Sequence, residues 1–149
     1  MDVQIGRDTV LALCAIAWAD GKMDPQEAAS IREAARQLAL SAEDKSAVEA
    51  ALASTYDLAQ VETVRMNRLT RLFTYACGVW IAIVDGALSP EEERALTLLG
   101  DRVGLSEVAR ARAKSVVEAA RASSGADQSI DLQKLRARLS AGLSQIGND

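Results

Sequence analysis

The chain contains no histidine and only two cysteines among its 149 residues. The absence of histidine excludes His-based catalytic triads, zinc sites with imidazole ligands and the His-Pro-Asp motif of J domains. Cys14 and Cys77 are far apart and lie in the most apolar segments, so we interpret them as small core residues and not as nucleophiles or a disulfide. No glycine-rich phosphate loop is present either, and we therefore do not expect an enzyme.

Aromatic side chains are scarce, at 3% of the residues, although 49% are hydrophobic. The core must therefore be aliphatic and rich in alanine. Ala, Leu, Glu, Arg and Gln favour helices, and alternating β-branched runs are absent. These features predict an all-α protein, folded as a helical bundle of about seven helices.

Positive charge is not in excess, since the net charge is −4 and the isoelectric point is near 4.9. A nucleic-acid-binding domain carries a basic surface, so we expect protein partners and no nucleic acid. Residues 10–19 and 76–84 are apolar but too short to span a membrane, and the acidic residues before the first run argue against a signal peptide. We expect a cytoplasmic protein; short basic groups at 110–114 and 134–138 leave association with a membrane surface as a second interpretation.

A short acidic corner occurs twice in the chain. Residues 20–27 read Asp-Gly-Lys-Met-Asp-Pro-Gln-Glu, and residues 85–92, 65 positions later, read Asp-Gly-Ala-Leu-Ser-Pro-Glu-Glu. An apolar helical run precedes each copy and a helical pattern follows it. The repeat therefore predicts two helix-corner-helix units of one kind.

Each corner has the signals that end one helix and begin the next. Gly21 and Gly86 suit the positive φ of a helix C-terminus, which glycine adopts without steric cost. Asp24 and Ser89 suit the N-cap of the next helix, and each is followed by a proline at the first helical position. A glutamate three positions after each cap completes a capping box.

The aspartate at the head of each corner is not explained by helix capping. Asp20 and Asp85 place negative charge at a helix C-terminus, where the macrodipole disfavours it. Either these carboxylates accept hydrogen bonds from the turn amides, or they bind a cation together with Glu27 and Glu92. Carboxylate oxygens suit a hard cation such as Ca²⁺ or Mg²⁺. Each corner resembles only the second half of an EF-hand loop, so such a site requires both corners.

The same residues carry a family resemblance. Ala-Asp-Gly-x-hydrophobic-Asp-Pro-x-Glu at 19–27, Val-Asp-Gly-x-Leu-Ser-Pro-Glu-Glu at 84–92 and Leu-Gly-x-x-x-Gly-Leu-Ser at 99–106 resemble the TerB-like tellurite-resistance family. The resemblance covers residues 8–122 and implies an all-helical domain, a bacterial stress-response role and an acidic site for a divalent metal. It transfers the family's acidic positions to the following four residues: Asp20, Glu27, Asp85 and Glu92.

We divide the chain into a helical domain at residues 8–122, with Asp8 capping its first helix, a polar linker at 123–129 and an amphipathic helix at 130–146. The last helix is expected to dock on the domain or on a partner, and a homodimer through it is one form of the second arrangement. Our main hypothesis is a non-enzymatic module that binds a divalent metal and interacts with proteins. The alternative is a structural protein-interaction domain whose acidic corners serve only as caps and turns.

Overall fold

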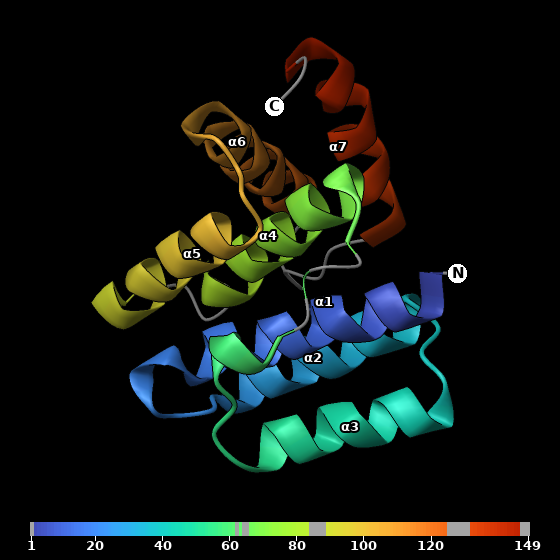
Figure 1. The fold of residues 1–149 in the computed structure, drawn as a ribbon, viewed down its shortest axis with the longest axis vertical. Helices are drawn as coiled ribbons and strands as arrows, with labels where there is room; N and C mark the ends of the chain where they lie inside the picture. The colour runs from blue at the N-terminus through green and yellow to red at the C-terminus, as the bar shows by residue number, and fades with distance from the viewer. Residues whose placement is uncertain (1, 62, 64–65, 84–88, 125–131, 147–149) are drawn as a thin grey trace.

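The structure, a computed structural model, describes residues 2–61, 63, 66–83, 89–124 and 132–146, and for residues 2–5, 20, 121–124 and 142–146 it describes the backbone alone. The described residues form seven α-helices and two short 3₁₀ helices, with no strand among them (Figure 1). This confirms the all-α bundle predicted from composition and helical periodicity.

The helices follow one another with short connections. Their bounds are α1 (Asp2–Ala17), η1 (Trp18–Asp20), α2 (Pro25–Gln37), α3 (Ala42–Ala53), η2 (Leu58–Gln60), α4 (Arg68–Ile83), α5 (Pro90–Arg102), α6 (Glu107–Ser124) and α7 (Leu132–Ile146). The two central helices, α1 and α4, pack against each other; α2 and α3 pack on α1, whereas α5, α6 and α7 pack on α4 (Figure 1). None of the described helices combines the length and the apolar character needed to cross a membrane.

The first helix begins earlier than its capping signal indicated. Asp8 was expected to cap this helix, but α1 starts at Asp2, and Asp8 is buried within it at 3% exposure. The guanidinium of Arg7 lies 3.8 Å from the Asp8 carboxylate and 3.6 Å from that of Asp44 on α3. Because this cation lies close to both carboxylates, Asp8 is tolerated inside the helix instead of at its cap.

The core lies between α1 and α4 and is mainly aliphatic. Leu13 and Ile16 of α1 are fully buried, as is Ile81 of α4. Gly78 lets α5 approach α4 closely, because a Cβ at this position would lie 3.1 Å from a methyl carbon of Leu99. This close approach places the helix that follows the second acidic corner directly against the core.

The helix bounds repeat at the same offset as the acidic corners. Pro25 begins α2 and Pro90 begins α5, 65 positions later, and the same spacing separates the first residues of α3 and α6. Thr9 and Thr74, also 65 positions apart, form a hydrogen bond between their buried hydroxyls at 2.8 Å. Contacts between equivalent positions are the kind that two packed copies make about a two-fold axis.

This threonine pair supports a double-mutant test. We expect Thr9→Val to lower the free energy of unfolding by about 1–2 kcal/mol, because it leaves the buried Thr74 hydroxyl with only a weak hydrogen bond to Met66 Sδ at 3.8 Å. The variant with both threonines changed to valine should lose less than the sum of the two single losses. Urea denaturation of the four proteins measures this difference, and simple additivity would contradict an energetic coupling between the two hydroxyls.

The C-terminal helix packs on its own chain in this structure. It contacts α4, α6 and α2, and its residues Leu132, Leu135 and Leu139 are each no more than 1% exposed. They belong to the same hydrophobic cluster as the core of α1 and α4. The linker expected at 123–129 falls partly on the last residues of α6 and partly outside the described residues.

Candidate functional site

The first acidic corner forms the turn that its glycine predicts. After α1 ends, η1 carries the chain to Asp20 as a tighter 3₁₀ turn. Gly21 then adopts a φ of 84°, and its amide donates to the carbonyl oxygen of Trp18 at 2.8 Å. This left-handed conformation reverses the chain into the N-terminus of α2.

The acidic residues that follow Gly21 cap α2 through their side chains. Asp24 Oδ1 accepts a hydrogen bond from the amide of Gln26 at 2.7 Å, and Glu27 Oε1 accepts one from the amide of Asp24 at 3.3 Å. Pro25 occupies the first helical position, where no amide is needed. The predicted capping box is therefore present.

The second corner builds its cap in the same way with a serine. Ser89 Oγ accepts from the amide of Glu92 at 3.0 Å, and Glu92 Oε1 accepts from the amide of Ser89 at 3.0 Å. Gly86 and Asp85 lie outside the described residues. The described part of this corner thus matches the first corner in geometry, with serine in place of Asp24.

The side chains of the two capping glutamates are less exposed to solvent than is usual for capping residues. Glu27 and Glu92 are each 2% exposed. Charged side chains are almost never buried to this extent unless their charge is compensated. A capping box on a solvated helix does not require such burial. Helix capping alone therefore does not account for the burial of these two carboxylates.

The first corner lies against the helix that the second corner begins. The short helix η1 packs on α5. Trp18 and Ala19 line a groove of about 360 Å³ together with Glu91 and Arg94 from the first turns of α5. The sequence does not indicate whether the two corners meet; in the structure, η1 lies next to the N-terminal part of α5.

The structure places the side chains of two of the four candidate metal ligands. Glu27 and Glu92 are placed with their side chains, whereas Asp20 is placed by its backbone alone and Asp85 is outside the described residues. Among the described residues, no group of three Asp, Glu or Cys side chains is close enough to hold a metal ion. The four-carboxylate site therefore stays a prediction.

Two arginines that were not predicted from the sequence to be functional form hydrogen bonds to the backbone of the segment before α4. Arg71 donates to the carbonyl oxygens of Thr63, Met66 and Val103 at 3.0, 2.9 and 3.0 Å. Arg102, in the last turn of α5, donates to the carbonyl oxygen of Val61 at 2.6 Å. For Arg102 the available sequence signal was a basic residue at a helix C-terminus, where the macrodipole favours it. Arg71 lies in the first turn of α4 and had no such signal.

Both cysteines are buried as free thiols. Burial raises the pKa of Cys14 to about 12, with a further contribution from the negative charge of Glu49. Burial also raises the pKa of Cys77 far above its usual value. Neither side chain forms a thiolate near neutral pH, which supports their interpretation as core residues.

The N-terminal part of the chain is similar to a known protein family. Residues 1–50 match the family described as tellurite resistance protein TerB. The matched segment contains α1, the first acidic corner, α2 and most of α3. No curated protein and no solved structure matches the chain. The match confirms the TerB-like resemblance over residues 1–50, which include the first acidic corner, whereas the second corner at 84–92 and the segment at 99–106 lie outside the matched residues.

Proposed function

We propose that this protein is a non-enzymatic module of the TerB-like kind that binds a divalent cation, Ca²⁺ or Mg²⁺, and interacts with other proteins. The observation that carries the proposal is the burial of Glu27 and Glu92, which occupy the same capping position in the two corners and are each 2% exposed. Asp20 and Asp85 would supply the remaining carboxylates, since each stands at the head of its corner.

The chemistry of these groups supports a hard cation. A carboxylate has two oxygens, and in each capping box one of them accepts a backbone amide at 3.0 to 3.3 Å. Both Ca²⁺ and Mg²⁺ bind carboxylate oxygens, and Ca²⁺ accepts variable coordination geometry. A cation between the corners would be attracted by the buried negative charge of Glu27 and Glu92.

The interaction part of the proposal rests on a different feature. The groove beside η1 presents Trp18, Tyr56 and Leu98 among charged residues, and Leu98 is 59% exposed. Aromatic and aliphatic side chains within a polar rim are typical of protein interfaces. Given the TerB-like assignment, we propose a cytoplasmic role in stress response or tellurite resistance.

Calorimetric titration of the full chain with Ca²⁺, Mg²⁺ and Mn²⁺ tests the metal site. We expect saturable heat with at least one cation, with a Kd in the range of about 10⁻⁷ to 10⁻³ M that carboxylate sites span. Excess chelator should reverse the binding. The absence of saturable heat with all three cations at millimolar concentration would contradict the proposal.

That negative result would favour the alternative, a structural protein-interaction domain without metal. The observation in its favour is that both capping boxes form entirely from protein donors and acceptors. In that case the acidic corners serve only to end and begin helices. The groove beside η1 would then be the functional surface of the module.

A further inference from the structure

A second hollow lies on another part of the molecule, between the end of α2, the start of α4 and α7. Its volume is about 520 Å³, and we call it the α7 pocket. Leu38, Leu69, Phe73 and Leu132 form its apolar lining. Pockets for small molecules typically measure about 300–1,000 Å³ and are mostly apolar with a few polar groups, so this hollow has a suitable size and character.

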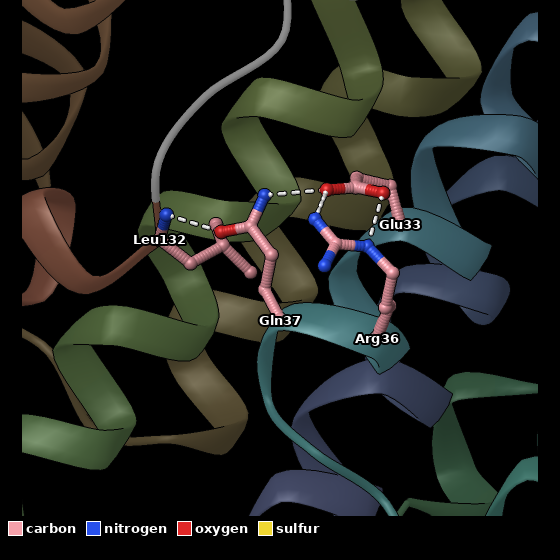
Figure 2. Close-up of polar contacts among 4 residues, drawn as sticks. All are labelled: Glu33, Arg36, Gln37 and Leu132. Atoms are coloured by element: carbon pink, nitrogen blue, oxygen red, sulfur yellow. Dashed lines mark hydrogen bonds and ion pairs between the residues drawn. The ribbon is translucent and has the colours of Figure 1, made fainter.

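A hydrogen bond between two residues that line the α7 pocket, Gln37 and Leu132, joins α2 to α7 (Figure 2). Gln37 Oε1 accepts a hydrogen bond from the backbone amide of Leu132, the first residue of α7, at 2.7 Å. Gln37 Nε2 donates to Glu33 Oε2 at 3.1 Å, and Arg36 Nε donates to Glu33 Oε1 at 2.9 Å. The amide group of Gln37 is therefore fixed from both ends, and the pocket wall is formed before any ligand arrives.

The charges of Glu33 and Arg36, which lie on α2 next to the pocket lining, compensate each other. Hydrogen bonds from Arg36 and Gln37 lower the pKa of Glu33 to about 2, so its carboxylate is ionised at neutral pH and pairs with Arg36. The N-terminal amide of α7 already has Gln37 as its acceptor. Neither the Glu33–Arg36 pair nor this amide of α7 therefore attracts an outside ion.

Arg136 is the charged group of the pocket that has no such compensation. It lies one turn beyond Leu132 on α7, is partly buried and lines the pocket beside the apolar surface. No hydrogen bond or ion pair joins it to any residue that the structure describes. An arginine side chain is always protonated and recognises carboxylates through its planar fork of donors.

We propose that the α7 pocket binds a medium-chain carboxylate, with its hydrocarbon chain on Leu38 and Leu69 and its carboxylate on Arg136. This ligand matches the pocket in both respects, because it is apolar along its length and carries one negative charge at its end. The size of the hollow favours a small molecule over an acidic amphipathic peptide, which needs a longer groove. The site is separate from the acidic corners and does not depend on metal binding.

Titration of the full chain with decanoate, followed by calorimetry, tests this site. We expect saturable binding that is about tenfold tighter than that of decanol, which has the same chain length but no charge. Arg136→Gln should weaken decanoate binding about tenfold and leave decanol unaffected. Arg138→Gln, an exposed arginine on the same helix, is the matched control and should bind decanoate as the wild type does.

A second variant tests the cavity without changing its charge. Ala137 lines the pocket and is exposed, so Ala137→Leu should fill space in the pocket while the protein stays folded. It should weaken decanoate and decanol alike. Equal decanoate binding by wild type, Arg136→Gln and Ala137→Leu would overturn the proposal, as would the absence of saturation. Binding of an acidic amphipathic peptide through Arg136, without binding of decanoate, would overturn it in favour of a protein ligand.

Discussion

Replacing Leu135 and Leu139 together by alanine is expected to lower the free energy of unfolding by about 4–8 kcal/mol. Both side chains are essentially inaccessible to solvent, at 1% and 0% exposure, and both belong to the single buried cluster that also contains the core of α1 and α4. Each large-to-small change in a packed core removes apolar burial and leaves a cavity, at a cost of about 2–5 kcal/mol. Since small domains have only about 5–15 kcal/mol of stability, the double variant should be close to unfolding.

Chemical denaturation measures this loss, and Leu98→Ala is its control. Leu98 lies on α5 and is 59% exposed, so its replacement should change stability by less than about 0.5 kcal/mol. If the double variant were no less stable than this control, α7 would not be part of the core in solution. A chain that ends at residue 122, the predicted C-terminal boundary of the helical domain, lacks α7. If the leucines of α7 are essential, this shorter chain should show no cooperative thermal transition.

The combined substitution Glu27→Gln/Glu92→Gln is expected to weaken binding of the preferred cation by about 100-fold or more. Glutamine serves a capping box as glutamate does, so the stability of the metal-free protein should change by less than about 1 kcal/mol. The variant loses two charged oxygen ligands, and the cation should no longer raise its melting temperature. Calorimetry and thermal melts with and without metal measure the two effects separately.

Glu107→Gln is the matched control for that experiment. Glu107 is also an acidic residue in the first turn of a helix, α6, but it is exposed and belongs to neither corner. It should bind metal as the wild type does. Unchanged metal affinity in the Glu27→Gln/Glu92→Gln variant would show that these carboxylates act only as caps.

Local signals in the sequence were sufficient to place the first residues of α2 and α5. The two prolines mark the first residues of α2 and α5, and the side chains of Asp24 and Ser89 accept the hydrogen bonds expected of N-caps. These predictions succeed because a cap, a proline and a glycine at positive φ act on the four or five residues around them. The predicted start of α1 was wrong because it relied on local sequence alone. Asp8 has the local character of a cap, but it lies inside the helix, where Arg7 compensates its charge.

The sequence predicted which carboxylates could form the candidate site, but it did not predict how fully they are buried. The sequence identified Glu27 and Glu92 as equivalent carboxylates, because the corners repeat. Their near-complete burial depends on how α2 and α5 pack against other helices, which no local pattern reports. The position of η1 against α5 likewise depends on packing between segments that are distant in the chain.

The helical class, the turn at Gly21 and the residues that begin α2 and α5 can be read from the sequence alone, since they follow from backbone conformation and short-range hydrogen bonds. Which distant groups meet depends on the tertiary structure. It brings Thr9 to Thr74 across the core, and it lets Gln37 accept the amide of Leu132 from 95 positions away. It also leaves Arg136 beside an apolar hollow. These contacts arise because the packing of apolar faces sets the positions of whole helices, and polar side chains then meet whichever groups that packing brings near.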